Sequence, residues 1–337
     1  MTGKERIFTA LRLGEPDRVP TFEWFIDAAV GKALTGETDA IEVVDALDLD
    51  GINIRPDYSQ KRLDDTTFMD EWGIKRRLTG DCLPCVIESP ISDITAQAAC
   101  KFPDPKAPHR FATLERALER FGDRRAVILN LRDGFSDMRD LLGYEDALVQ
   151  LMLEPERYSE MLNRVVDFNL ALAETACSRY GIKVIATTDD VANANGLLLS
   201  PDQYFEIIGP AFRRVIGGYR ELGCHVIKHC DGNVNKLVDF WIESGISCLD
   251  PIDPSAGLKM DDFKTRYGRK ICLKGNINCA GSLQFGTEVD VENEVKDCLL
   301  KGGRSGLILS SSNTIHRGVK PENYRAMLNM LKRSSLN

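Results

Sequence analysis

The sequence predicts an α/β fold, and more specifically a TIM (β/α)8 barrel with an inserted hairpin region near its N-terminal half. Short β-rich runs alternate with helical patterns along the chain, which indicates a parallel sheet. These runs number about eight, and most of them end in polar residues. The 337 residues exceed the ~250 that such a barrel usually needs. Because no low-complexity linker or internal repeat interrupts the chain, we expect residues 1–337 to form a single domain.

The predicted strands are short runs rich in aliphatic and β-branched side chains. They lie at residues 19–23, 51–54, 126–130, 183–187, 225–229, 247–250, 270–274 and 306–310. The length beyond a minimal barrel falls mainly in residues 58–125. Within that region, residues 72–77 and 84–88 are typical of a hairpin, which we expect to lie over the barrel mouth.

The predicted helices have recognisable starts. Ser200 is a suitable N-cap, and Pro201 follows it at the first helical position. Pro155 and Pro321 mark the starts of two further helices. After Pro201, apolar side chains recur with helical spacing at Phe205, Ile208, Phe212, Val215 and Ile216. We interpret such stripes as core positions.

Composition excludes several classes of protein. The net charge of −8 provides no basic surface for nucleic acid. No run of ~18 apolar residues is present, so we expect no membrane span. Residues 1–6 carry charges and do not resemble a signal peptide. The ten scattered cysteines are typical of free thiols in a reducing compartment, so we expect a cytoplasmic protein.

Polar side chains gather at the C-terminal ends of the predicted strands. In a barrel these ends converge on one face, which is where barrel enzymes have their active sites. The pattern therefore predicts an active-site mouth. Its candidate residues are Asn53, Arg55, Asp57, Asn130, Arg132, Asp133, Asp189, Asp190, His229, Asp231, Asp250, Asp253, Asn276, Asn278, Ser311, Ser312 and Asn313.

Three of these residues, His229, Asp231 and Asp253, suggest a metal site. Zinc accepts imidazole and carboxylate ligands, and a catalytic zinc site needs three protein ligands with one open position. Cys230 alternates with His229 along its strand, so its side chain is expected to face the opposite way. We therefore predict a zinc ion held by His229, Asp231 and Asp253.

The chain resembles the uroporphyrinogen decarboxylase superfamily in a series of segments that cover nearly its whole length. In chain order these segments are Thr188–Asp190, Gly196–Pro201, His229–Asn233, Leu249–Pro254, Lys274–Ile277 and Val319–Asn323. The opening Glu15–Pro20 also resembles the superfamily's branch of corrinoid-dependent methyltransferases. The resemblance implies a TIM barrel, in agreement with the strand count.

The resemblance also distinguishes between activities. Decarboxylases of the superfamily carry an Arg-Gln-Ala-Gly-Arg segment whose arginines hold the substrate carboxylates, but residues 22–28 here contain no arginine. In the methyltransferase branch, zinc is bound by His-x-Cys and a later cysteine. Here His229 matches the histidine, Asp231 replaces the first cysteine, and residues 310–313 contain no cysteine. Oxygen ligands leave a harder metal, which suits polarising an ether oxygen better than delivering a thiolate.

The resemblance thus implies an O-demethylase methyltransferase I-like enzyme, which moves a methyl group from an aryl methyl ether to the cobalt of a corrinoid protein. The implied catalytic residues are His229, Asp231, Asp189 and Asp190. The implied substrate contacts are Phe22, Trp24, Asn193, Asn276 and Asn313. The cations at residues 75–77, near Trp72, would form a rim for docking of the corrinoid protein. A homodimer is also possible.

Three alternatives stay open. One is a uroporphyrinogen decarboxylase-like lyase. Another is a methylcobalamin:thiol methyltransferase. The third is a non-catalytic protein that binds a corrinoid or tetrapyrrole and has lost the metal.

Overall fold

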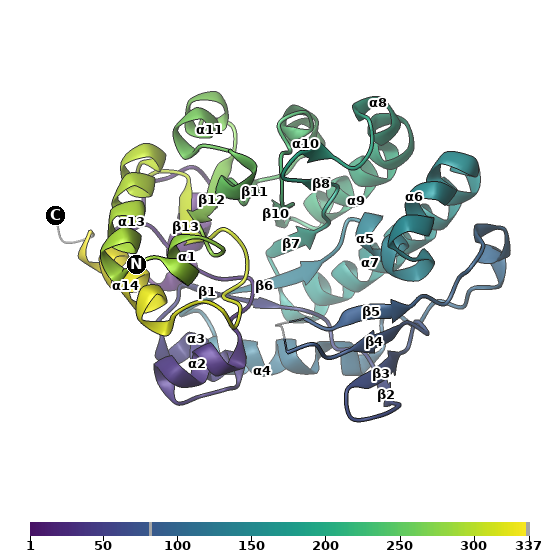
Figure 1. Ribbon diagram of the computed structural model, residues 1–337, viewed down its shortest axis with the longest axis horizontal. Helices are drawn as coiled ribbons and strands as arrows, with labels where there is room; N and C mark the ends of the chain where they lie inside the picture. The colour runs from purple at the N-terminus through teal and green to yellow at the C-terminus, as the bar shows by residue number, and fades with distance from the viewer. Residues whose placement is uncertain (81–82, 335–337) are drawn as a thin grey trace.

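Seven parallel strands form the central sheet of the protein in a computed structural model that describes residues 1–80 and 83–334 (Figure 1). The strands lie side by side in chain order, and each is parallel to its neighbours. This arrangement is that of a TIM-like barrel. The strands are β1 (Gly51–Ile54), β6 (Ala126–Leu131), β7 (Val184–Thr188), β10 (His225–His229), β11 (Cys248–Asp250), β12 (Cys272–Ile277) and β13 (Leu307–Ser311).

The predicted strand at residues 19–23 is not formed as a regular strand. The segment nevertheless runs between the two edge strands of the sheet. The carbonyl of Pro20 accepts a hydrogen bond from the Leu309 N–H of β13 at 2.9 Å, and the carbonyl of Thr21 accepts one from the N–H of Asp50, just before β1, also at 2.9 Å. Pro20 has no N–H of its own, which prevents a full ladder.

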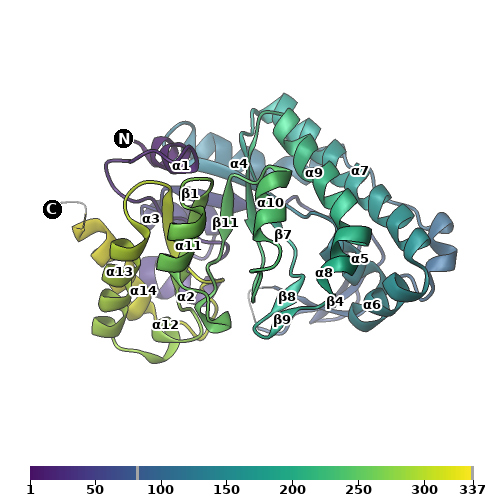
Figure 2. The same cartoon turned by 90° about the horizontal axis from the view of Figure 1, so that it is seen from above.

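Helices lie outside the seven strands of the central sheet (Figures 1 and 2). The α-helices are α1 (Gly3–Leu11), α2 (Ala28–Thr35), α3 (Ala40–Ala46), α4 (Ala112–Phe121), α5 (Phe135–Leu142), α6 (Tyr144–Leu153), α7 (Pro155–Tyr180), α8 (Pro201–Gln203), α9 (Gly209–Glu221), α10 (Val238–Ser244), α11 (Met260–Tyr267), α12 (Ser282–Phe285), α13 (Glu288–Gly302) and α14 (Pro321–Arg333). Short 3-10 turns cover Ile94–Ala99, Pro108–Phe111 and Pro254–Ala256, and a π-helical turn covers Tyr204–Ile208. None of the helices in the described part of the chain has the length and apolarity needed to cross a membrane.

The predicted helix starts at Pro155, Pro201 and Pro321 are confirmed. The side chain of Ser200 accepts a hydrogen bond from the Gln203 N–H, which caps α8 as expected. The apolar stripe that follows is buried at four of its five positions. The exception is Phe205, which is 38% exposed, so its interpretation as a core residue is wrong.

The region expected to hold an inserted hairpin contains a four-stranded antiparallel sheet, formed by β2 (Gln60–Arg62), β3 (Thr67–Asp70), β4 (Lys75–Arg77) and β5 (Cys85–Glu88). Trp72, in the turn between β3 and β4, packs edge-on against Phe168 of α7 with ring centroids 4.6 Å apart. Arg76 of β4 forms an ion pair with Asp140 of α5. These contacts attach the small sheet to the helices beside the barrel.

Alternate residues of the barrel strands build an interior in layers. The layer nearer the N-terminal ends of the strands is apolar, and α1 packs against it through Ile7, Ala10 and Leu11. Its strand residues are Ala126, Ile128, Val184, Ala186, Ile227, Cys248, Cys272 and Ile308. Two residues further along each strand the character changes to polar. The residues at these positions are Asn130, Thr188, His229, Asp250, Lys274 and Ser310. The polar layer is therefore the floor of the barrel mouth.

Candidate functional site

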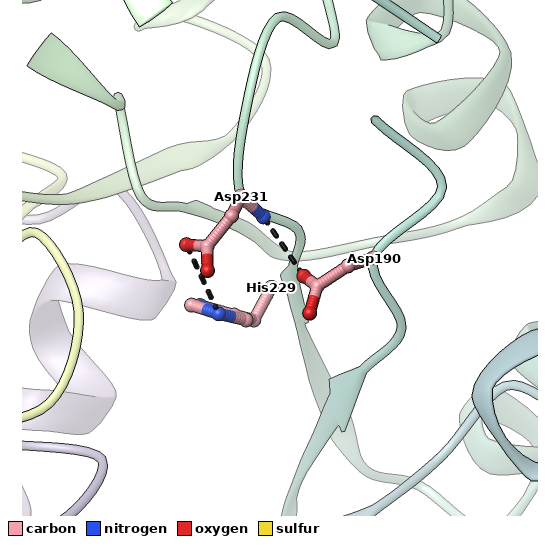
Figure 3. Close-up of side chains that lie close together, drawn as sticks. All are labelled: Asp190, His229 and Asp231. Carbon is pink, nitrogen blue, oxygen red and sulfur yellow. Dashed lines mark hydrogen bonds and ion pairs between the residues drawn. The ribbon is translucent and has the colours of Figure 1, made fainter. Parts of the chain in front are cut away.

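Three metal-competent side chains, those of Asp190, Asp231 and the polar-layer residue His229, lie close together at the barrel mouth (Figure 3). Each offers one ligand atom, and these atoms all lie within 4.8 Å of one another. His229 ends β10 and is paired with Thr188, the last residue of the adjacent β7, so Asp190, two residues beyond the end of β7, lies near it. Oδ1 of Asp231 lies 3.5 Å from Nε2 of His229. The backbone N–H of Asp231 donates to Oδ1 of Asp190 at 3.0 Å.

The His229 ring is fixed from its other side. Its Nδ1 lies 2.5 Å from Oδ2 of the fully buried Asp250, so Nε2 is left facing Asp231. Trp24 also donates its indole N–H to Oδ2 of Asp250 and packs edge-on against the imidazole, with ring centroids 4.7 Å apart.

Asp250 also has a cationic partner. Its Oδ1 accepts a hydrogen bond from Nζ of Lys274 at 2.8 Å. That ammonium group also donates to Ser310 and lies over the rings of Phe22 and Trp24. The charge of this buried lysine is thus matched by the buried carboxylate that orients His229.

The electrostatics of the site follow from these contacts. Burial alone would raise the pKa of Asp250, but Lys274 and His229 hold it below its ordinary value. Burial opposes the charged form of His229, yet Asp231 and Asp250 together raise its pKa. Burial, reinforced by the neighbouring Asp190, raises the pKa of Asp231 to about 7. A divalent cation between these groups would relieve the repulsion between the carboxylates.

The donor set fits a zinc ion. One imidazole nitrogen and two carboxylates are a ligand set that catalytic zinc accepts, with a position left for substrate. The contact between His229 Nδ1 and Asp250 is the arrangement that commonly orients a histidine ligand toward such a metal. Asn313 adds support, because its side-chain amide donates to Oδ2 of Asp231 at 2.5 Å.

Asp253, which the sequence suggested as a ligand, occupies a different position. Its Oδ2 accepts a hydrogen bond from the Gly232 N–H at 2.9 Å, and its Oδ1 accepts from the N–H and hydroxyl of Ser255. Asp253 therefore caps the turn Pro254–Ala256 and anchors the loop that carries Asp231. The structure brings Asp190, rather than Asp253, into the metal-competent group.

Asp189 is separated from this group. It is fully buried, and its Oδ1 accepts a hydrogen bond from the Ser136 N–H at the start of α5. Nearby, Nζ of Lys228 donates to Asp133 at 2.6 Å and to the carbonyl of Asp189 at 3.0 Å. Burial and the neighbouring Asp189 raise the pKa of Asp133. This network supports the barrel wall between β6, β7 and β10.

A cavity of about 950 Å³ opens beside the metal-competent group. It lies between the barrel mouth and the antiparallel sheet, and its lining includes Trp24, Asp190, His229, Asp231 and Asn313. Its volume is within the range of small-molecule sites.

The remaining predicted substrate contacts do not line this cavity. Phe22 is buried in the barrel interior, and Asn193 is exposed in the short strand β8 (Ala192–Asn193), which pairs with β9 (Gly196–Leu197). Asn276 lies in β12, also away from the cavity.

Several important residues were not assigned a role from sequence. Arg55 and Arg132 line the cavity, and Asp250 supports His229, but all three were noted only as polar strand ends. Lys274 was noted only as part of a segment that resembles the family, and it was given no role. Its signal is positional, because it lies two residues after the interior residue Cys272 and must therefore face the barrel interior.

Comparisons with known proteins agree with the fold. The uroporphyrinogen decarboxylase (URO-D) family matches residues 64–334. A curated relative, the methylated-thiol–coenzyme M methyltransferase of Methanosarcina mazei, is 22% identical over 236 residues. That alignment covers 68% of this chain but only 59% of the relative's length. A solved structure of a methyltransferase from Methanosarcina mazei superposes with a TM-score of 0.80 at 17% identity, covering 99% of both chains. The chain belongs to the uroporphyrinogen decarboxylase family.

Proposed function

We propose that this protein is a corrinoid-dependent methyltransferase, which moves a methyl group from an aryl methyl ether to the cobalt of a corrinoid carried by a partner protein. The observation that carries the proposal is the group Asp190, His229 and Asp231 at the edge of a 950 Å³ cavity. Family membership and the methyltransferase relative support the general activity. The ether as donor is supported by the chemistry of the ligands.

Asp190, His229 and Asp231 would hold a zinc ion. When bound, the metal supplies a Lewis acid that stabilises the negative charge left on the donor oxygen after the methyl group departs. Cys230, the nearest cysteine in sequence, is fully buried in the outer core. The ligands are thus oxygen and nitrogen atoms, a harder set than the thiolates used for activating sulfur.

The surrounding residues orient the metal ligands and the substrate. Asp250 fixes the His229 ring, and Asn313 fixes the Asp231 carboxylate. Trp24 and Phe25 line the cavity beside them and provide an apolar wall against which an aromatic ring can pack. Such packing would hold the methyl group in line with the cobalt, and this alignment lowers the barrier to transfer.

A second candidate donor is a methylated thiol. The observation that favours it is the name of the curated relative, which describes an enzyme that acts on methylated thiols. The two donors are distinguished by supplying each of them separately.

The test mixes the protein, loaded with zinc, with cob(I)alamin and either 4-methoxyphenol or dimethyl sulfide. We expect loss of the cob(I)alamin absorbance with the ether, and no loss in the His229→Ala variant. Asp253→Asn is the matched control, because it changes a carboxylate next to the site that is not in the metal-competent group. Turnover with dimethyl sulfide alone would contradict the ether as donor, and turnover by His229→Ala would contradict the metal's role.

A further inference from the structure

Two cysteine thiols are in contact at the end of the barrel away from the mouth. Cys177 lies in the last turn of α7, and Cys224 lies directly before β10. Their Sγ atoms are 3.3 Å apart, although 47 positions separate the two residues in sequence. The helix α7 packs beside α9, which ends shortly before Cys224 (Figure 2). Tertiary packing therefore brings the two thiols together.

The two thiols differ in exposure. Cys177 is partly exposed, and the residues that follow it, Ser178 and Arg179, are exposed. Cys224, by contrast, is only 1% exposed. A small oxidant in solution can therefore reach Cys177, while Cys224 is shielded.

The contact also gives the two thiols different reactivity. A hydrogen bond from Cys224 lowers the pKa of Cys177, and the exposed Lys183 adds to this effect, although burial opposes it. The same contact, together with burial, raises the pKa of Cys224. The carbonyl of Ile182, 3.5 Å from Sγ of Cys224, is an alternative acceptor for the Cys224 proton. Since the thiolate is the reactive form, Cys177 is the nucleophile of the pair.

A second pair of neighbouring cysteines provides a contrast. Cys248 and Cys272 are partners in register on the adjacent strands β11 and β12. Both are fully buried in the apolar interior of the barrel, and burial raises the pKa of Cys248. This second pair thus has proximity without access, whereas Cys177 and Cys224 combine the two.

We propose that Cys177 and Cys224 form a reversible oxidation site, which reacts with hydroperoxides to give a disulfide between α7 and the start of β10. The Cys177 thiolate first attacks the terminal oxygen of the hydroperoxide. The O–O bond breaks, Cys177 becomes a sulfenic acid, and the released alkoxide or hydroxide takes a proton from water. The Cys224 sulfur then attacks the Cys177 sulfur, the S–O bond breaks, and hydroxide leaves with the Cys224 proton as water. In total, two electrons pass from the two sulfurs to the peroxide.

The structure needs only a small change for this reaction. A disulfide bond is about 2.0 Å long, so the sulfurs must approach by about 1.3 Å from their present 3.3 Å. Cys177 lies in the last turn of its helix, where local opening is easiest. The disulfide would form at the opposite end of β10 from His229, so it does not depend on the methyl transfer proposed above.

The resolving thiol has a protective effect. A disulfide is reversed by other thiols, whereas further oxidation of Cys177 to a sulfinic acid is not. A sulfinate would also place a negative charge against the buried Cys224, which is costly. Capture of the sulfenic acid by Cys224 therefore keeps the junction of α7 and β10 intact after oxidation.

The test treats the reduced full-length protein with a small molar excess of hydrogen peroxide, blocks the remaining thiols with N-ethylmaleimide and maps the peptides by mass spectrometry. We expect a peptide pair linked through Cys177 and Cys224, which dithiothreitol separates. Cys177→Ser and Cys224→Ser should each lose this linkage completely. In Cys224→Ser, dimedone should trap a sulfenic acid on Cys177, and without dimedone that residue should proceed to the sulfinic acid.

Two controls make the test specific. Cys100 is also partly exposed, and burial raises its pKa, so Cys100→Ser should form the linkage as the wild type does. In the wild type, Cys248 and Cys272 should stay reduced, which shows that the protein remains folded during the treatment. Three results would overturn the proposal: no linkage in the wild type, a linkage of Cys248 to Cys272 that forms equally fast, or as much sulfinic acid on Cys177 in the wild type as in Cys224→Ser.

Discussion

Nδ1 of His229 lies 2.5 Å from Oδ2 of Asp250, and the two residues are partners in register on adjacent strands. The register of the two strands therefore determines which ring nitrogen of His229 is left free for a metal. Since Asp250 is also paired with Lys274, its negative charge is maintained in a fully buried position. The orientation of the candidate ligand thus depends on three neighbouring barrel strands.

The first prediction concerns this carboxylate. Asp250→Asn keeps the shape of the side chain but removes its charge, so the Nδ1 proton of His229 loses its strongest acceptor. We expect zinc affinity to fall roughly 10- to 100-fold, as for other residues that orient a metal ligand. Competition with a chromogenic chelator measures the affinity, at a temperature where circular dichroism shows the variant folded. An unchanged affinity would mean that Asp250 only neutralises Lys274.

The second prediction concerns the identity of the ligands. Asp190→Asn leaves an oxygen that can still accept the Asp231 N–H, but it removes a charged ligand. We expect its zinc affinity to fall at least about tenfold, whereas Asp253→Asn should change it less than about threefold. The same chelator competition compares both variants with the wild type. The reverse order of effects would restore Asp253 as a ligand in place of Asp190.

Much of the fold could be predicted because period-two apolar runs and proline-marked helix starts are local signals. Seven strands lie within a few residues of their predicted positions. The segment 19–23 is extended between β13 and β1 but makes only isolated hydrogen bonds there. Its apolar pattern could not reveal how many ladder bonds it would form.

The site could be predicted only in part. The polar residues at the strand ends indicated the barrel mouth, and His229 and Asp231 lie close together at that mouth. Choosing among neighbouring aspartates required backbone geometry. Asp189 and Asp190 are adjacent in sequence, but one faces the Ser136 N–H of α5 and the other faces His229. Asp253 is engaged by the turn that follows it, a role that aspartate often has.

The third prediction is a pH dependence of stability. Glu23 is buried beside Ser311, and burial raises the pKa of its carboxyl group from 4.5 to about 7, although Lys274 opposes the rise. Between these values the folded protein holds a proton that the unfolded chain has released. The free energy of unfolding should therefore fall as the pH rises from 4.5 to 7, by up to about 3 kcal/mol from this residue.

Glu23→Gln mimics the protonated carboxyl group and should remove this contribution. Urea unfolding at several pH values between 4.5 and 8 measures it as the difference between variant and wild type. That difference should grow in favour of the variant as the pH rises. Glu119→Gln, an exposed substitution on α4, should show a constant difference. A constant difference for Glu23→Gln as well would contradict the assigned pKa.

The last prediction separates two arginines that the sequence grouped as one docking rim for a corrinoid protein. Arg76 faces inward, where its ion pairs with Asp70 and Asp140 attach the antiparallel sheet to α5. Its neighbour Arg77 is exposed, and Lys75 is paired with Glu88. Removing Arg76 would leave two nearly buried carboxylates without this partner. We expect Arg76→Gln to lower the free energy of unfolding by about 3 kcal/mol, and Arg77→Gln by less than about 0.5 kcal/mol.

Urea unfolding measures the stabilities of the two variants, and methyl-transfer kinetics test whether the exposed rim takes part in docking. If a corrinoid protein docks here, Arg77→Glu should raise its apparent KM while turnover with free cob(I)alamin stays nearly unchanged, because an exposed charge acts mainly on encounter. Arg76→Gln should impair both acceptors alike, since it disturbs the cavity wall. An equal loss with both acceptors in Arg77→Glu would show that the exposed rim has no part in docking.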